Sequence, residues 1–544
     1  MNSLRLAALL LSLLFAPGIG AAGPAPALVV VIVIDGTPQE QLVKYRDLYG
    51  PGGFKRLLEG GAWFGDAHHG QAITTTAPGH AVILTGTYPY RHGIIDNEWI
   101  DRTSLGQVYC TGDPAHTYIG HDTKKLDGTS PANLRVSTVG DELKYSNNGQ
   151  SKVITVSGKD RGAILLAGKR GTAYMYMDKS GSFASTTFYM KEHPRWHAQY
   201  YEGKPQDRWM GQSWPLLLPE AAYARSVVES QPWQRAYAGM GSRFPFTLPH
   251  ADQAPAYYAA LMRSPFGDDA MLEFARAAIE GENLGKNPAG VADILGISLS
   301  THDYVNHVFG PESRVSQDHL LRLDRALAGF FDYLERRIGL DNVLIAVTAD
   351  HGFMNVPEYS AALGLGGARF NDLKMMAELN AHLARRFGPG NHAVRISRAT
   401  ILLDPALIEK KSLNRVEVET EAARFLGSYP GLAAVFTRSQ LETGAWPNQP
   451  LALKVQRAWN RDLSGDLYLV LNPNTMMGGN AATHGSPYNY DTNVPLMFHG
   501  RPWIKPGKYP QAVSVADIAP TLAYLLEIRP PSGSEGRVLA EIIR

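Results

Sequence analysis

Three apolar runs, each ending at an aspartate, constrain the fold most strongly. The run ALVVVIVI covers residues 27–34 and stops at Asp35. DNVLIAVTADHG (341–352) places Asp350 and His351 just past a second run, and VADILGISLSTHD (291–303) ends at Asp303. Continuous β-branched runs are typical of strands buried on both faces of a parallel sheet. The sequence therefore predicts three buried strands with acidic residues beyond their ends.

Helical patterns separate these runs. Between 313 and 340, apolar side chains recur on one helical face: Leu320, Leu323, Leu327, Phe330, Phe331 and Leu334. Alternating strands and helices predict an α/β fold with a central, mostly parallel sheet flanked by helices. In such sheets ligands bind beyond the carboxyl ends of the strands. We therefore expect the three aspartates to lie near a common site.

The N-terminus has the features of an export signal. Arg5 precedes the apolar run LAALLLSLLF, and small residues follow at 20–23. This pattern predicts a cleaved signal peptide over 1–22 and a periplasmic or secreted protein, with an uncleaved anchor as the alternative. The run is too short to span a membrane, and no later candidate follows. Cys110 is the only cysteine, so no internal disulfide can form, and export without disulfides suits a bacterial periplasm.

The remaining chain, 23–544, is predicted to be one catalytic domain with two inserted cap regions. Residues 168–290 are rich in Tyr, Trp, Pro and Gly, and 391–465 carry strand and helix signals of their own. The net charge is +1 and no basic run stands out. We therefore expect no nucleic-acid binding.

Aspartates and histidines form a candidate metal set. Asp303 and His307 are one helical turn apart and can face the same point, whereas His302 projects elsewhere. Each signal alone also fits an ordinary ion pair, turn or cap. A set that combines neutral imidazoles with carboxylates and lacks thiolates predicts a catalytic zinc site. The candidates are Asp35, Asp303, His307, Asp350, His351 and His484.

The stretch ITTTAPGHAVILTG (73–86) places three threonines at a predicted helix start. Thr is a favoured N-cap residue and Pro is favoured in the first turn, so helix capping alone explains a hydroxyl there. A nucleophile can occupy the same place, because helix N-termini also receive anions. The stretch by itself leaves both interpretations open.

Taken together, these motifs resemble the alkaline phosphatase superfamily. Asp35, TTTAPGH, Asp303-x-x-x-His307, Asp350-His351 and His484 follow that family's order. The resemblance implies that the nucleophile is Thr76, two residues before the proline, and that Thr74 and Thr75 cap or pack. It also implies two Zn²⁺ ions. Their ligands would be Asp35, Thr76, Asp350 and His351 for one ion, and Asp303, His307 and His484 for the other.

Three further residues narrow the resemblance. Asn97 lies in IIDNEW, and Lys159 and Arg161 lie in SGKDRGA, a strand-like stretch whose alternation sends both side chains to one side. Each candidate has an ordinary structural alternative: Asn97 can be a turn residue, and the Lys–Arg pair can form a solvated basic face. The three resemble the phosphate-binding residues of phosphate-irrepressible (PafA-type) alkaline phosphatases.

This resemblance implies hydrolysis of small-molecule phosphate monoesters through a covalent phosphothreonine. A Lys–Arg pair suits the monoester dianion. A nucleotide or phospholipid phosphodiesterase of the same superfamily is the alternative, and a catalytically silent metal- or phosphate-binding protein is the alternative of another class. Sulfatases carry a C/S-x-P-x-R motif, which TAPGH lacks. The sequence does not indicate the oligomeric state.

Overall fold

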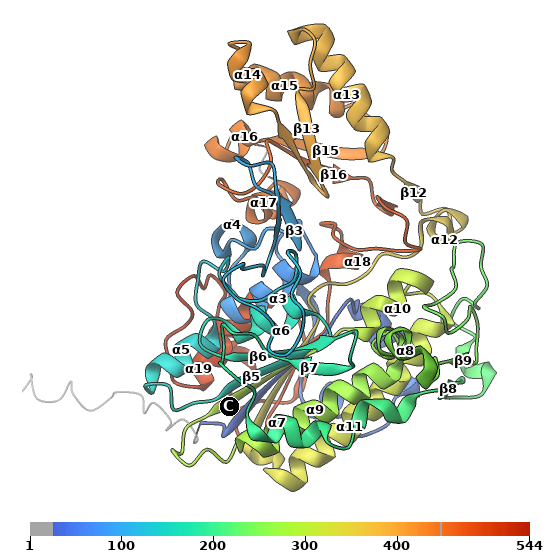
Figure 1. Cartoon of the computed structure of the whole chain (residues 1–544), viewed down its shortest axis with the longest axis vertical. Helices are drawn as coiled ribbons and strands as arrows, with labels where there is room; N and C mark the ends of the chain where they lie inside the picture. The colour runs from blue at the N-terminus through green and yellow to red at the C-terminus, as the bar shows by residue number, and fades with distance from the viewer. Residues whose placement is uncertain (1–24, 447–448) are drawn as a thin grey trace, which may run out of the picture.

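The fold is built on one nine-stranded sheet (Figure 1). The structure is a computed structural model, and it describes residues 25–446 and 449–544. The predicted signal peptide, 1–22, lies outside the described residues. In sheet order the strands are β19 (Gly507–Ser514), β2 (Ala62–His68), β18 (Leu496–His499), β11 (Val343–Thr348), β1 (Leu28–Ile34), β10 (Asp293–Leu299), β5 (Val153–Ser157), β6 (Thr172–Met177) and β7 (Ser182–Ala184).

The three apolar runs form the centre of this sheet. β1 pairs in parallel with β10 on one side and with β11 on the other. Five of the eight neighbouring strand pairs are parallel, and every residue of β1, β10 and β11 is buried. The predicted α/β fold with a mostly parallel central sheet is confirmed.

Helices cover both faces of the sheet. One face of β1, with Val30 and Ile32, packs with α9 (Pro265–Glu282) and α11 (Arg314–Arg337). The other face, with Val29 and Val31, packs with α3 (Thr76–Thr85) and α19 (Ile518–Leu525). Successive strand side chains point to opposite faces, so an unbroken apolar run supplies both cores. The predicted helix over 313–340 corresponds to α11.

The first expected insertion, 168–290, is not set apart from the main domain. Its strands β6 and β7 extend the central sheet, and its helix α9 packs on that sheet. The intervening segment carries α7 (Arg195–Tyr201), β8 (Ser213–Trp214), β9 (Phe246–Thr247) and α8 (Ala254–Leu261). Aromatic side chains such as Trp214, Phe246 and Tyr257 form a core of their own there.

The second expected insertion, 391–465, belongs to a separate four-stranded sheet. Its strand order is β13 (Ala393–Ser397), β14 (Thr400–Leu403), β16 (Leu467–Leu471) and β15 (Leu432–Thr437), and all its pairs are antiparallel. Its core includes residues of α13 (Asp372–Phe387) and α15 (Arg415–Leu426), so the unit extends beyond the predicted bounds. Figure 1 shows it in orange above the central sheet. Smaller helices complete it: α14 (Pro405–Lys410), α16 (Arg438–Thr443) and α17 (Pro450–Ala458).

Within the described ranges, no helix has the length and apolar character that a bilayer crossing requires.

Candidate active site

The three predicted aspartates lie at one edge of the sheet. Asp35 directly follows β1, Asp350 follows β11 and Asp303 lies in α10 (Thr301–Phe309), which follows β10. Because β1 pairs in parallel with both neighbours, the carboxyl ends of the three strands meet. All three aspartates are buried.

Two groups of ligating atoms form at this edge. Asp35, Asp350 and His351 make one, and Asp303, His351 and His484 make the other, each with its atoms within 4.8 Å of one another. His307 joins the second group, with its Nε2 3.4 Å from Asp303 Oδ1. His351 therefore borders both groups, whereas the resemblance implied that it belongs to the first alone.

Backbone carbonyls orient the three imidazoles. The Nδ1 atoms of His351, His307 and His484 donate to the carbonyl oxygens of Gly352 (2.8 Å), Ala482 (3.0 Å) and Thr74 (2.8 Å). This arrangement leaves each Nε2 facing the carboxylates, as metal-ligating histidines require. Burial lowers the pKa of all three, so each imidazole is held neutral and ready to ligate.

The donor set fits divalent metal ions. Within the described residues, three ligating atoms are buried and have no hydrogen-bond partner: Asp35 Oδ1, Asp303 Oδ1 and His351 Nε2. Burial and the neighbouring Asp350 carboxylate raise the pKa of Asp35 well above its usual range. Buried carboxylates this close together are stable only when positive charge compensates them, and nitrogen and oxygen donors are ligands that zinc binds.

Lys159 supplies part of this positive charge. Its Nζ lies 2.7 Å from Asp35 Oδ2 and 2.6 Å from Asp303 Oδ2. Burial opposes protonation of Lys159, but the carboxylates of Asp303 and Asp35 outweigh it and raise its pKa above the usual range. The ammonium group therefore stays charged between the two ligand groups.

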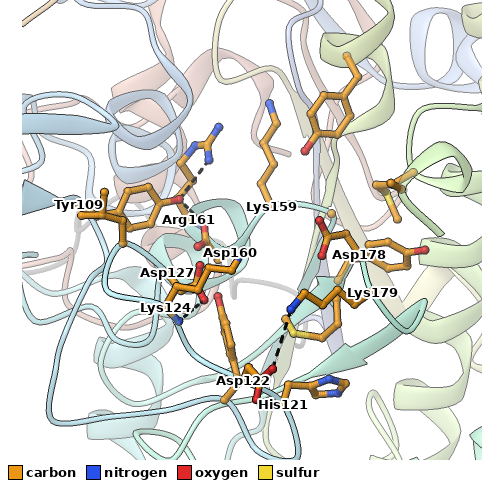
Figure 2. Close-up of a pocket in the computed structure, with 18 of the residues that line it drawn as sticks. Tyr109, His121, Asp122, Lys124, Asp127, Lys159, Asp160, Arg161, Asp178 and Lys179 are labelled. Carbon is orange, nitrogen blue, oxygen red and sulfur yellow. Dashed lines mark hydrogen bonds and ion pairs between the residues drawn. The ribbon is translucent and has the colours of Figure 1, made fainter. Parts of the chain in front are cut away.

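Lys159 and Arg161 are not on a strand, contrary to the sequence-based expectation. β5 ends at Ser157, Lys159 is the N-cap of α6 (Asp160–Ala167), and Arg161 lies in the first helical turn. Ser157 Oγ accepts from the backbone N–H of Lys159 at 3.0 Å, which closes the strand-to-helix turn. Both side chains nevertheless line one cavity, the pocket that Figure 2 shows.

Tyr109 holds the Arg161 guanidinium (Figure 2). Arg161 Nη1 donates to the Tyr109 hydroxyl at 3.2 Å, and that hydroxyl donates to Asp160 Oδ1 at 2.5 Å. Asp160 Oδ2 also accepts from the backbone N–H of Gly128 at 2.7 Å. Figure 2 shows Lys159 and Arg161 extending to the same side, away from Asp122 and Lys179.

The three threonines have different partners. Thr74 Oγ1 donates to the Ser486 carbonyl at 2.8 Å, and Thr75 Oγ1 donates to Asp96 Oδ1 at 2.9 Å. Thr75 is the N-cap of α3 without a side-chain cap bond, and Thr76 is the first helical residue. Within residues 25–446 and 449–544, the Thr76 hydroxyl makes no such hydrogen bond to the protein, and Thr76 lines the cavity described below.

Asn97 lies beside this helix start. Its Oδ1 accepts from the backbone N–H of Ala77 at 2.8 Å, which leaves the amide NH₂ group as its donor for a ligand. One cavity of about 450 Å³ gathers most of the predicted site residues: Thr76, Asn97, Arg161, Asp303, His307 and His484. Arg398, Asp372 and Asn480 line the same cavity.

Three residues that contact the predicted site residues were not predicted from the sequence. His80 Nδ1 lies 3.1 Å from Asp350 Oδ2 and 2.8 Å from the Thr76 carbonyl. Asp96 accepts from Thr75 and from the backbone N–H of Asn97, and Tyr109 holds Arg161. His80 follows the TAP motif by two residues and could have been noticed there, whereas the contacts of Asp96 and Tyr109 depend on the tertiary fold.

Sequence comparisons place the chain among curated phosphatases. The family model described as type I phosphodiesterase / nucleotide pyrophosphatase matches residues 29–500. Alkaline phosphatase PafA of Elizabethkingia meningoseptica is 34% identical over 96% of this chain and 95% of its own. Alkaline phosphatase PhoV of Synechococcus elongatus is 35% identical over 95% and 93%. A protein of Myroides odoratus named calcium-transporting ATPase is 34% identical over 95% of both chains.

A solved structure agrees with these matches. The crystal structure of a PafA variant, substituted at a threonine, an asparagine, a lysine and an arginine, superposes with a TM-score of 0.89. It is 32% identical and covers 96% of this chain and 100% of its own. The chain therefore belongs to the type I phosphodiesterase / nucleotide pyrophosphatase family of the alkaline phosphatase superfamily, and within it resembles alkaline phosphatase PafA.

Proposed function

We propose that the protein is an alkaline phosphatase that hydrolyses phosphate monoesters at a two-zinc site, with Thr76 as nucleophile. The observation that carries the proposal is the single cavity that joins Thr76, Asn97 and Arg161 to Asp303, His307 and His484. A nucleophile, donors for phosphoryl oxygens and metal ligands thus face one space. The curated alkaline phosphatases similar to this chain support the same activity.

The residues divide into three roles. Asp35, Asp350 and His351 would hold one zinc ion together with Thr76, and Asp303, His307 and His484 would hold the other. Bound there, two zinc ions would lower the pKa of the Thr76 hydroxyl and stabilise the leaving oxygen. Asn97, Lys159 and Arg161 would hold the nonbridging phosphoryl oxygens.

The reaction then has two displacements. Thr76 Oγ1 loses its proton and bonds to phosphorus, while the leaving oxygen departs with the electron pair of the broken P–O bond and takes up a proton to become the alcohol. Water then attacks the phosphothreonine and breaks the bond between phosphorus and Thr76 Oγ1. One water proton returns to Thr76, and inorganic phosphate leaves. His80 would act as a positioning residue, because its Nδ1 contacts both the Thr76 carbonyl and the Asp350 carboxylate.

One comparison supports treating four of these residues as a unit. The residues substituted in the PafA variant have the same types, order and spacing along the chain as Thr76, Asn97, Lys159 and Arg161. The relative named as an ATPase fits the same scheme, since loss of a terminal phosphate from ATP is also displacement at a terminal phosphoryl group.

Phosphodiester hydrolysis is the second candidate, because the matching family model carries the phosphodiesterase name. The decisive experiment compares zinc-loaded enzyme on phenyl phosphate and on methyl phenyl phosphate. Strong preference for the monoester is expected. Equal or higher kcat/KM on the diester would favour the phosphodiesterase, and no turnover of either would indicate a silent binding protein.

The signal-like N-terminus supports a periplasmic or secreted location. Release of phosphate from organic monoesters outside the cytoplasm would be the corresponding task. Fractionation of cells that express the full chain, with sequencing of the mature N-terminus, tests this: cleavage near residue 22 in the periplasm is expected, and full-length cytoplasmic protein would contradict it.

A further inference from the structure

Arg398 reaches the active-site cavity from the separate four-stranded sheet. It lies in the turn between β13 and β14, yet its side chain lines the cavity that contains Thr76 and His484. Its backbone φ is +45°, in the left-handed region where glycine is favoured over side-chain-bearing residues. The backbone conformation of this turn therefore does not explain an arginine at position 398, and the contacts of its side chain must be considered.

The guanidinium of Arg398 is held loosely beside the nucleophile helix. Its Nε lies 3.4 Å from Asp96 Oδ2, and its Nη1 lies 3.4 Å from the His484 carbonyl. A Cβ added at Gly485 would lie 3.3 Å from Arg398 Nη1 and 3.4 Å from Thr75 Cγ2, so this glycine leaves room for the guanidinium near Thr75. The side chain remains 40% exposed and has donors to spare.

The position of Arg398 relative to the two ligand groups indicates its role. Under the proposed function, Thr76 acts together with Asp35, Asp350 and His351. In an in-line displacement the leaving oxygen would therefore lie on the opposite side, toward Asp303, His307 and His484. Arg398 contacts the backbone of His484, so it borders that side. Of the twelve residues that line the cavity, Arg161 and Arg398 are the two with permanent positive charge, and Arg161 is already assigned to the phosphoryl group.

We infer that Arg398 binds an anionic group on the leaving group and so favours phosphoanhydrides, such as inorganic pyrophosphate and nucleoside di- and triphosphates, over esters of neutral alcohols. A planar guanidinium can form two parallel hydrogen bonds to a phosphate, and these strengthen with the charge of the acceptor. This inference rests on the proposed function, because it assigns the leaving-group side.

The step balances as an ordinary displacement. Thr76 Oγ1 loses its proton and bonds to the terminal phosphorus, while the bridging oxygen departs with the electron pair of its bond as part of the leaving phosphate, which takes up the proton. Arg398 neutralises charge on that phosphate. Water then releases the second phosphate from Thr76. Asp372 also lines this cavity and would repel an anion, so the charged group is expected at Arg398 and away from Asp372.

The test compares kcat/KM for inorganic pyrophosphate and phenyl phosphate in zinc-buffered solution. Arg398→Ala should lower the value for pyrophosphate about tenfold or more and the value for phenyl phosphate less than threefold. Arg398→Lys should recover part of the loss, because it keeps the charge but not the bidentate geometry. Arg395→Ala, an exposed arginine on β13 outside the cavity, is the matched control and should change neither.

Each outcome has one meaning. Equal losses on both substrates would overturn the inference and indicate that Arg398 positions Asp96. A loss of bound zinc in Arg398→Ala, measured by elemental analysis, would also overturn it and indicate that Arg398 supports His484. Unchanged kinetics would overturn it as well. Failure of the wild-type enzyme to hydrolyse phenyl phosphate would instead refute the proposed function.

Discussion

At the residue scale, the phosphoryl-binding role proposed for Lys159 and Arg161 should distinguish a monoesterase from a diesterase. A monoester presents a dianion, whereas a diester presents a monoanion with one fewer nonbridging oxygen. Charge-assisted hydrogen bonds strengthen with the charge of the acceptor, so the pair should stabilise the monoester transition state more.

The double variant Lys159→Ala with Arg161→Ala tests this selectivity. Each contact contributes about 2–3 kcal/mol, or roughly 30- to 150-fold in rate, and the two need not add. We expect kcat/KM for a monoester to fall steeply and that for the matched diester to fall much less, with zinc content measured in parallel. Equal factors for both substrates would assign the pair a general structural role.

Tyr109 is expected to act through Arg161. Its hydroxyl accepts from Arg161 and donates to Asp160, so Tyr109→Phe should free the guanidinium. We expect kcat/KM for monoesters to fall about three- to tenfold, in line with the loss of one hydrogen bond of about 1 kcal/mol. In an Arg161→Ala background the same change should have no further effect. An undiminished effect there would show that Tyr109 acts independently of Arg161.

At the scale of elements, α10 and the loop that carries His484 come from distant parts of the chain and complete one ligand group. Asp303→Ala and His484→Ala should therefore each reduce bound zinc from two ions to one per chain and weaken stabilisation of the leaving group. Elemental analysis of purified protein measures this. The exposed His250→Ala is the control. Two zinc ions in both variants would show that neither residue is a ligand.

The segment between α10 and α11 contains a carboxyl group that should make stability depend on pH. Glu312 is 5% exposed, and burial raises its pKa from 4.5 to about 7. Between these pH values the folded state binds more protons than the unfolded state. The contribution of Glu312 to the free energy of unfolding therefore falls as the pH rises from about 4.5, and the destabilisation is complete above about 7.

Glu312→Gln should remove that penalty. We expect the variant to gain up to about 3 kcal/mol of unfolding free energy over the wild type at pH 8, and the gain to vanish near pH 4.5. Urea unfolding at a series of pH values measures the difference, with the exposed Glu59→Gln as control. A gain that is the same at every pH would contradict this interpretation of Glu312.

At the scale of the whole molecule, local sequence patterns predicted the sheet and its ligand-bearing edge. The runs that became β1, β10 and β11 are long, β-branched and buried on both faces, so pattern alone identified them. Because their carboxyl ends meet, the sequence also predicted that Asp35, Asp303 and Asp350 lie together.

Other features depended on contacts that no local pattern records. The strand β6 (TAYMYM) is aromatic and methionine-rich, so its segment resembled a cap although it extends the sheet. Lys159 and Arg161 were expected on a strand-like stretch, but the chain turns into α6 between Ser157 and Asp160. Arg398 enters the cavity from another sheet, and only the folded chain brings it there.

The central claim is that Thr76 carries the phosphoryl group during turnover. The most direct measurement is peptide mass spectrometry of zinc-loaded enzyme quenched in acid during hydrolysis of phenyl phosphate at several pH values. We predict one phosphoryl group on the peptide that begins α3, with fragment ions that place it on Thr76, and none in a Thr76→Ala variant that retains its metal but has lost most turnover. Phosphate on Thr74, Thr75 or another residue, or full turnover by Thr76→Ala, would contradict the assignment.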